Sequence, residues 1–563
     1  MIYHCEDHTC NYWDEGEKLP ERCPQCGRKL LRANEADMTG DDWTALGNTL
    51  WDAEASDKKR MVDCFRKAAY LGSAWGVCNL GICMEQGNGV EADPVQAFWL
   101  YRQPVEMGSL NAVCCLGVCY QYGIGTAPDA KQAAELYCKA AEYGSPRGQM
   151  LLARAFHDGI GVEADAAEAV YWVRAAAYQR YGEGMHRLGV CYEYGDGVEQ
   201  NWERAVHWFR EAAESGVSVA MADLGYCYEK GCGVEQSWEQ AFSWYRRCAD
   251  CGFGVSMCNL GRCYERGYGV EQNWQEAVKW YEQGAQCGHL QSMNNLAYCY
   301  ERGEGVEQNE ERALYWYRRG AEAGSDYCMY CLGWNYSNGE GVEQNMTEAI
   351  RWYTAAAEGG NADAMHDLGW HYDHGEGVEQ DMKKAICWYE RAAEQNHPAA
   401  MNSLGECYAM GRGVPRDLET AMEWYRRAAE LGEAMADYNM GWHLEQAGKL
   451  SEAYAHYRKA ADGNDDSAWW ALGRFYENGV VVAQDGKEAR RCYETGEKLG
   501  SVKCKMRLAR CKLLGIGGHR AKKAGLDLCR QALELAKESS EKEDYGYEAE
   551  MNLLRRTIAE NES

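Results

Sequence analysis

The stretch Met221–Ser256, MADLGYCYEKGCGVEQSWEQAFSWYRRCADCGFGVS, is one copy of a unit that fills most of this 563-residue chain. Its Leu224-Gly225 pair recurs every 36 residues in an unbroken register from Leu80 to Met440, with alanine replacing the glycine at positions 153 and 297. Looser copies, which bring the count to fourteen units, begin at Leu46, Leu472 and Leu508. A fixed period of this length is typical of stacked repeats, so we predict an all-α solenoid.

Each unit is expected to form two helices. Leu224 and Tyr228 are four residues apart and share one face of the first helix, which ends at a glycine-rich turn. Alanine, then the pair Trp244-Tyr245, and finally Gly252 follow in the second helix and at its end. The residue thirteen after the leucine is a good N-cap for that second helix in ten consecutive units: Asp93, Asp129, Asp165, Asn201, Ser237, Asn273, Asn309, Asn345, Asp381 and Asp417.

The pattern L-G-x-x-Y, G-x-G-V, A-x-x-W-Y-x-x-A-A-x-x-G resembles the Sel1-like repeat, a relative of the tetratricopeptide repeat with a longer inter-helix turn. The resemblance covers residues 42–540. It implies a right-handed superhelix of antiparallel helix pairs that acts as an adaptor for other proteins. Two units, 42–72 and 437–463, lack the G-x-G-V turn and are closer to the tetratricopeptide form. The second of them shortens the repeat step from 36 to 32 residues, which is expected to change the local pitch.

Composition narrows the function classes. A net charge of −28 disfavours general binding to nucleic acids or anionic membranes. The sequence contains no apolar run long enough to span a membrane and no signal-peptide pattern at its start, so we expect a cytoplasmic protein. We call the leucine of each repeat's Leu-Gly or Leu-Ala pair, or the methionine at position 440, the anchor of that repeat. The cysteines that recur three residues after the anchors are interpreted as small packing residues: Cys83, Cys119, Cys191, Cys227, Cys263, Cys299, Cys407 and Cys511.

Residues 1–33 do not follow the repeat. Cys23 and Cys26 have the two-residue spacing of a zinc knuckle, whereas the pair Cys5 and Cys10 departs from it with four residues between. Together with Tyr3, the segment resembles a rubredoxin-like zinc ribbon. The predicted zinc ligands are Cys5, Cys10, Cys23 and Cys26. Two alternatives stay open: His8 replaces one of the first two cysteines, or the site binds iron and transfers electrons. Residues 34–41 are a polar linker, and residues 541–563 contain a capping helix at Tyr547–Ile558.

Several other clusters have a simple structural interpretation. The tryptophans that share one register in eight second helices, from Trp172 to Trp424, are assigned to the core between repeats. Asp367, His371 and His374 share a helix face at a spacing suitable for a metal, but His371 takes a packed position and is interpreted as a core histidine. The basic stretch from Lys503 to Arg530 is either a solvated face or a docking patch for an acidic partner.

The binding surface is predicted from the resemblance, because first helices line the concave side in this repeat class. Positions two and five after each anchor would then form parallel ladders of aromatic and acidic side chains. The predicted aromatic contacts are Tyr226, Tyr298, Trp334, Trp370 and Trp442, and the predicted acidic contacts are Glu193, Glu229, Glu265, Glu301 and Asp373. An acidic face with incidental aromatics is the alternative.

With no phosphate loop, nucleophile elbow or carboxylate pair particular to one unit, we predict a non-enzymatic scaffold. Its partner is expected to be a protein or peptide that carries basic residues beside an apolar anchor. The alternative function is redox or enzymatic chemistry at the N-terminal four-cysteine site.

Overall fold

The computed structural model describes residues 2–5, 13–15, 30–32, 38–51, 55–542 and 547–562, with side chains from residue 38 onward except at residues 55–56, 538–542 and 562. Three strands precede the helices: β1 Ile2–Cys5, β2 Trp13–Glu15 and β3 Leu30–Arg32. They pair antiparallel in the order β2-β1-β3. Cys10, Cys23, Cys26 and His8 lie outside the described residues, as does the side chain of Cys5, so the zinc ligands stay a prediction.

The chain divides into two compact units, one holding residues 1–292 and 304–306, the other 293–303 and 307–563. The helices of the first unit are α1 Gly40–Thr49, α2 Ala55–Tyr70, α3 Ala74–Gln86, α4 Pro94–Glu106, α5 Leu110–Tyr122, α6 Ala130–Glu142, α7 Pro146–Asp158, α8 Ala166–Tyr178, α9 Gly182–Tyr194, α10 Trp202–Glu214, α11 Ser218–Lys230, α12 Trp238–Asp250, α13 Gly254–Arg266 and α14 Trp274–Gln286. The division falls within α15 Leu290–Arg302.

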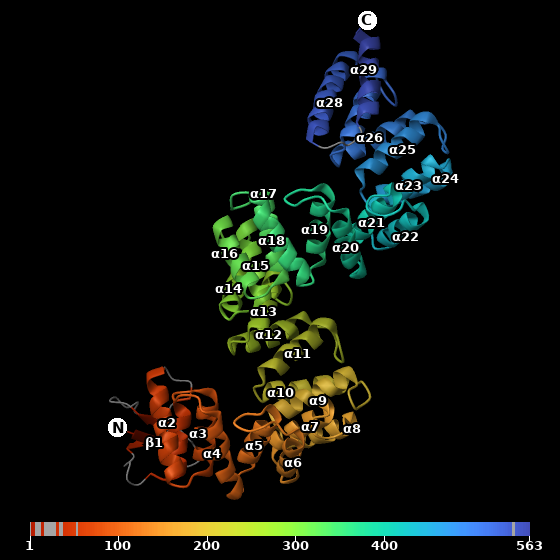
Figure 1. The fold of residues 1–563 in the computed structure, drawn as a ribbon. Helices are drawn as coiled ribbons and strands as arrows, with labels where there is room; N and C mark the ends of the chain where they lie inside the picture. Colours follow the sequence, from red (N-terminus) through yellow and green to blue (C-terminus); the bar gives the residue numbers. More distant parts are fainter. Residues whose placement is uncertain are drawn as a thin grey trace. The chain divides into compact units, whose positions relative to one another are not determined.

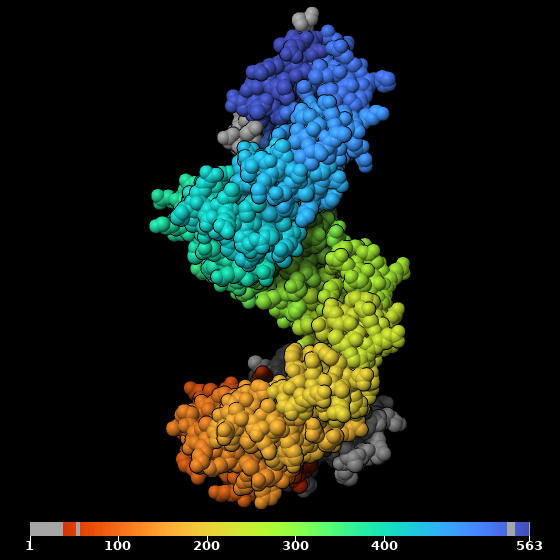
Figure 2. Space-filling model, turned by 90° about the vertical axis from the view of Figure 1, so that its right-hand side faces the viewer, coloured from red at the N-terminus to blue at the C-terminus, as the bar shows by residue number. Residues whose placement is uncertain are grey.

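The helices of the second unit are α16 Glu310–Glu322, α17 Asp326–Asn338, α18 Met346–Glu358, α19 Ala362–His374, α20 Met382–Glu394, α21 Pro398–Met410, α22 Leu418–Glu430, α23 Ala434–Gln446, α24 Leu450–Asp462, α25 Asp466–Asn478, α26 Gly486–Lys498, α27 Val502–Leu514, α28 Lys522–Lys542 and α29 Glu548–Glu562. In both units helices pack on their chain neighbours as hairpins (Figure 1), and colours follow sequence order along each unit's surface (Figure 2). The predicted α solenoid is confirmed. No described helix is both long and apolar enough to cross a membrane.

The predicted N-caps are confirmed in all ten units. The Oδ1 atom of Asn309, for example, accepts a hydrogen bond of 2.9 Å from the backbone N–H of Arg312. Each cap satisfies an amide that the first turn of a helix leaves without a partner, which contributes about 1 kcal/mol to stability. The second helices therefore begin where their sequence places them.

The glycine turn has two separate tasks, seen clearly in the α11/α12 hairpin. Gly231 ends α11 in the left-handed conformation, with φ of 75°, and its N–H donates to the carbonyl oxygen of Cys227. Gly233, with φ of 67°, lies against α10 of the preceding hairpin, where an added Cβ would overlap the carbonyl group of Trp202. Gln236 then fastens the turn, since its Nε2 donates to the Glu229 carbonyl oxygen at 2.8 Å. The first glycine therefore stops a helix, and the second stacks one repeat on the next.

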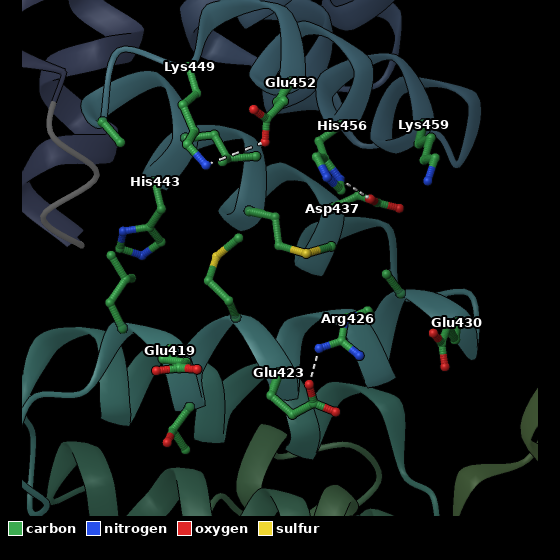
Figure 3. Close-up of a pocket in the computed structure, with 17 residues that line it drawn as sticks. Glu419, Glu423, Arg426, Glu430, Asp437, His443, Lys449, Glu452, His456 and Lys459 are labelled. Atoms are coloured by element: carbon green, nitrogen blue, oxygen red, sulfur yellow. Dashed lines mark hydrogen bonds and ion pairs between the residues drawn. The ribbon is translucent and has the colours of Figure 1, made fainter.

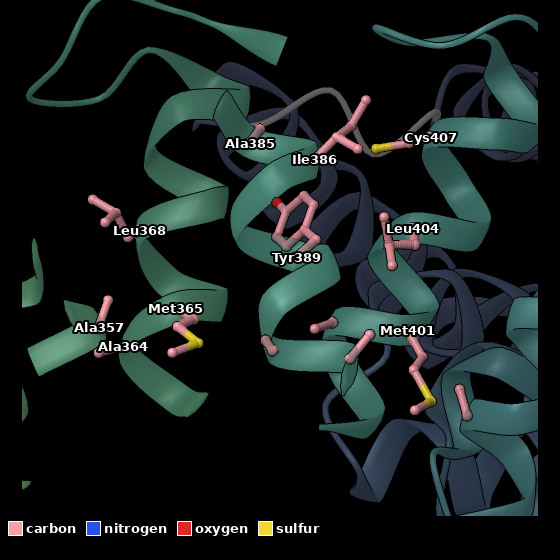
Figure 4. Packing of buried hydrophobic residues seen from close by; sticks show 14 of the residues in the cluster. Ala357, Ala364, Met365, Leu368, Ala385, Ile386, Tyr389, Met401, Leu404 and Cys407 are labelled. Atoms are coloured by element: carbon pink, nitrogen blue, oxygen red, sulfur yellow. The ribbon is translucent and has the colours of Figure 1, made fainter. Parts of the chain in front are cut away.

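The anchor glycine makes room for an aromatic ring from the second helix of its own hairpin. A Cβ on Gly225 would lie 2.5 Å from Cε1 of Tyr245, closer than real carbon atoms approach. Ten tyrosines at this register are among the largest fully buried side chains: Tyr101, Tyr137, Tyr245, Tyr281, Tyr317, Tyr353, Tyr389, Tyr425, Tyr457 and Tyr493. Figure 4 shows Tyr389 among buried aliphatic side chains of α19, α20 and α21. Tyrosine on glycine is thus the repeated packing contact of the solenoid.

The tryptophans that precede these tyrosines are packed less deeply. Trp244, Trp280 and Trp316 are 9% exposed, whereas the other five of the series are half-buried. The prediction that these tryptophans form the core between repeats is therefore only partly right, because the neighbouring tyrosines are more deeply buried. The eight cysteines of the repeat are all buried, as a packing role requires, and burial raises the pKa of Cys227 to about 12.

The C-terminal helix covers the last hairpin, as predicted. Tyr547, Met551 and Leu554 pack with Met506 of α27 and Cys529 of α28 in one buried cluster. The hairpin and the terminal helix thus share a single core, so α29 closes the end of the array.

A charged network joins the same elements. Glu550 of α29 accepts hydrogen bonds from Arg507 at 2.7 Å and from the Trp470 indole at 3.3 Å, and its second oxygen forms an ion pair of 2.6 Å with Arg507. Glu477 of α25 pairs with both Arg507 and Arg510. Part of the basic stretch from Lys503 to Arg530 is therefore engaged inside the fold and is neither a purely solvated face nor a free docking patch.

Candidate partner-binding surface

The aromatic residues two after the anchors lie on first helices and face solvent. Tyr226 of α11 is 46% exposed, and in the second unit Tyr298 of α15, Trp334 of α17 and Trp442 of α23 are 43%, 46% and 38% exposed. Trp370 of α19 is half-buried and stacks on His374 with ring centroids 4.3 Å apart. Large aromatic side chains left in water have a high propensity for protein contacts. The structure therefore leaves the aromatic half of the predicted set accessible.

The acidic residues five after the anchors are engaged with neighbouring side chains. Glu229 is the clearest case: its side chain is 4% exposed, and its Oε2 accepts from the Tyr245 hydroxyl at 2.9 Å and from Arg262 at 2.6 Å. Lys230 lies 3.0 Å from its other oxygen. A buried carboxylate requires such partners, because its charge is otherwise left without solvation. Glu229 thus supports the fold of its own repeat and the next.

The same bond from tyrosine to acid recurs along the array. Tyr281 donates to Glu265 at 2.6 Å and Tyr317 donates to Glu301 at 2.8 Å. Burial and the nearby carboxylate charge both raise the pKa of the Tyr245 and Tyr317 hydroxyls, which therefore remain protonated donors. The sequence contains a signal for this bond, since the acid and the tyrosine are 16 residues apart in each of these repeats. The predicted ladders instead place each acid beside the aromatic residue of its own helix.

Two members of the acidic set depart from this arrangement. Phe209 stands where other repeats have tyrosine and offers Glu193 no hydroxyl, and burial raises the pKa of Glu193. Asp373 is 4% exposed and forms an ion pair of 3.0 Å with Arg412. Contact between any of these acids and a partner stays a prediction, and the aromatic residues are the more accessible half of the set.

The histidine cluster of α19 is held by ordinary contacts. His371 is 5% exposed and its Nδ1 lies 3.1 Å from the carbonyl oxygen of Glu376, which confirms its interpretation as a packed core residue. Burial lowers the pKa of His371, so the ring is neutral at physiological pH. Asp367 accepts from the Tyr330 hydroxyl at 3.2 Å. Within the described part of the chain, no group of three histidine, cysteine or carboxylate side chains is arranged to hold a metal.

A cavity of about 400 Å³ lies among α7, α8 and α9, where the repeat pattern changes at two residues together. Ala153 replaces the anchor glycine and Val173 replaces the tyrosine. A smaller side chain at the centre of the hairpin leaves space, which polar residues line: His157 contacts Asp158 at 2.7 Å and Asp196 at 3.2 Å. The cavity follows from the missing ring.

Comparison with known proteins identifies the repeat. The Sel1 repeat profile matches twelve consecutive segments, residues 76–109, 112–145, 146–181, 182–217, 218–253, 254–289, 290–325, 326–361, 362–397, 398–433, 434–465 and 468–501. The chain is similar to c5321, a protective antigen present in uropathogenic Escherichia coli strains displaying an SLR fold. The identity is 29%, the coverage is 76% of this chain and 94% of that one, and the TM-score is 0.54.

Two further solved structures are similar over shorter stretches. A Sel1 repeat protein from Oxalobacter formigenes is 28% identical, with 56% of this chain and 94% of that chain covered and a TM-score of 0.47. The immunity protein Pa5087 from Pseudomonas aeruginosa is 20% identical, with 38% and 81% covered and a TM-score of 0.29. No curated protein matches the chain. Because the repeat profile matches well over half of the residues, the chain belongs to the Sel1 repeat family.

Proposed function

We propose that this protein is a cytoplasmic scaffold that binds another protein through the exposed aromatic residues of its first helices. The observation that supports the proposal most directly is the exposure of Trp334 and Trp442, 46% and 38%, on the first helices α17 and α23. Tryptophan buries a large area on binding and loses little conformational entropy, so it is a frequent hot spot.

The partner is proposed to be a protein segment with apolar anchors beside lysine or arginine. Apolar anchors match the aromatic side chains, and the net charge of −28 attracts a basic partner. The half-buried carboxylates Glu265 and Glu301, which lie on first helices as the aromatic residues do, add negative potential even while they accept hydrogen bonds from tyrosine. Affinity should therefore fall as salt concentration rises. The N-terminal segment is proposed to hold one structural zinc ion and to have no part in this contact.

Quantitative affinity capture from the native cell tests the proposal. The full-length protein is compared with a Trp334→Ala, Trp370→Ala double variant and with Trp99→Ala, a control that removes a more exposed tryptophan (58%) from α4, the second helix of its hairpin. We expect the double variant to lose the principal partner while Trp99→Ala retains it. A Glu265→Gln, Glu301→Gln variant measures the contribution of the acids separately. If the double variant folds and retains every partner, the proposed surface is wrong.

A further inference from the structure

The short repeat 437–463 lacks the turn that covers the preceding second helix elsewhere in the chain. In the α21/α22 hairpin, Gly413 of that turn lies on α20, where an added Cβ would be 2.7 Å from Met382 Cβ and 2.8 Å from Ile386 Cδ1. Only residues 447–449 join α23 to α24. An added Cβ on Gly448 would meet nothing within 4 Å. The shorter connection therefore fails to reach the helix before it.

The helix left uncovered is α22. Leu418 and Met422 stand 36 residues after Met382 and Ile386 and are their equivalents in the repeat. Met382 is half-buried and Ile386 is 7% exposed beneath their turn, whereas their equivalents Leu418 and Met422 are 39% exposed and half-buried. A cleft of about 1160 Å³ opens here between α22 and α24, with α23 as its floor (Figure 3). The cleft lies wholly within the second unit and does not include the aromatic surface described above.

The cleft has an apolar floor. Met440 and Leu444 of α23 line it together with Ala447, and Met422 and Ala429 of α22 add apolar side chains from the wall. Methionine side chains are flexible and polarizable and adapt to the shape of an apolar partner. The walls are helices whose backbone hydrogen bonds are made internally, so they offer no edge to which an extended strand could pair. A helix, which needs only side-chain contacts, suits such a groove.

Charges on the two walls differ. On the α22 side Arg426 forms an ion pair with Glu423. Glu419 and Glu430 form no ion pair with another residue of the cleft. On the α24 side Lys449 lies 3.7 Å from Glu452, and His456 lies 2.7 Å from Asp437. Lys459 forms no ion pair with another residue of the cleft. One wall is therefore acidic and the other is basic. Opposite walls of opposite sign favour one orientation of a charged ligand.

We propose that this cleft binds an amphipathic α-helix of a partner protein. The helix would place an aliphatic stripe, spaced i, i+4, i+7, on the methionine floor, lysine or arginine toward α22, and aspartate or glutamate toward α24. The lined faces run from Leu418 to Glu430 and from Lys449 to Lys459. A helix of about three turns, roughly 16 Å long, spans that length.

The test uses the full-length protein and a defined probe. The probe is a lactam-bridged, fluorescein-labelled 14-residue helix with leucines at the stripe positions, lysines on one flank and glutamates on the other. Its binding is measured by fluorescence anisotropy. Leu418→Glu puts a charge in the cleft, and Leu431→Glu is the matched control because Leu431 ends the same helix, is 48% exposed and does not line the cleft.

We expect wild type and Leu431→Glu to bind the probe with the same affinity and Leu418→Glu to bind at least tenfold more weakly. A probe with lysines and glutamates exchanged should bind severalfold more weakly than the original. Absence of binding to wild type, or equal binding by Leu418→Glu, overturns the proposal. Sedimentation supplies a further check: a wild-type dimer that Leu418→Glu dissociates would identify the occupant as a second copy of this chain and also overturn it.

Discussion

The contact between the anchor glycine and the tyrosine of the second helix determines how closely each hairpin packs. Gly225 lets the ring of Tyr245 lie against the backbone of α11, and the hydroxyl of that ring reaches Glu229 one turn further along. Where Val173 replaces the aromatic ring, alanine replaces the glycine at position 153 and a cavity remains. Ala297, in the hairpin with Tyr317, shows that one methyl group is tolerated in another setting. The free-energy cost of a methyl group at the anchor glycine therefore depends on how the aromatic ring of the second helix packs against it.

Gly225→Ala tests this pairing. The added methyl group must displace Tyr245, so we expect the free energy of unfolding to fall by about 1–2 kcal/mol. In a protein that already carries Tyr245→Val, Gly225→Ala should reduce the free energy of unfolding much less, because the tyrosine ring is absent. Urea denaturation of the four proteins of this double-mutant cycle gives the coupling. If the effects of Gly225→Ala and Tyr245→Val on the free energy of unfolding are strictly additive, the two residues are not coupled as described here.

Asp465 provides a pH-dependent test at the same scale. It caps α25 by accepting from the Ala468 N–H at 2.6 Å, and burial raises its pKa to about 6. Since the unfolded value is about 3.9, the folded state binds this proton more tightly, and the contribution of Asp465 to stability is lost as pH rises from about 4 to 6.

Asp465→Asn keeps a good cap without the charge. At pH 7.5 we expect the variant to be more stable than wild type by about 1 kcal/mol, and at pH 4 the two should unfold at the same denaturant concentration. A difference that does not depend on pH would show that the charge of Asp465 is not the cause.

At the scale of the element, the turn between the helices decides whether one hairpin stacks on the next. Gly231 ends its helix, and Gly233 fits against α10, so both left-handed glycines are needed for different reasons. Where the turn is absent, between α23 and α24, the preceding helix is left uncovered and the cleft opens. The length of one loop thus changes a surface of the array.

Gly233→Ala and Gly252→Ala separate these effects. Both residues have positive φ, 67° and 86°, so alanine costs about 1 kcal/mol of backbone strain at either site. Only at Gly233 would the new methyl group also overlap Trp202, because nothing lies within 4 Å at Gly252. We expect the free energy of unfolding, measured by thermal unfolding, to fall by at least about 2 kcal/mol more in Gly233→Ala than in Gly252→Ala. Equal losses would mean that the turn does not hold the repeats together.

For the whole molecule, much of the architecture was predictable because a period of 36 residues is visible along the chain and each cap follows local rules. All ten N-caps and the closing helix α29 are found where the sequence places them. Contacts between side chains on different helices were harder to predict. The acid Glu229 points to Tyr245, and Arg507 points to Glu550, because burial selects partners that spacing along one helix does not indicate.

The N-terminal segment is predicted to fold around its metal independently of the repeats. Replacing Cys23 and Cys26 with serine should release one zinc ion per chain, because thiolates supply the binding energy, while helicity is nearly unchanged. Elemental analysis and far-ultraviolet circular dichroism measure the two quantities. An early loss of helicity throughout the protein would make the segment an integral cap, and bound iron would favour the electron-transfer alternative.

The most direct test of the scaffold account is hydroxyl-radical footprinting of the full-length protein with and without the purified principal partner. The method reports the solvent access of individual aromatic side chains. We predict that binding protects Tyr298, Trp334 and Trp442 and leaves Trp99 and Tyr171 of the second helices unchanged. Protection of Trp99 and Tyr171 with no change at Trp334 and Trp442 would contradict the account.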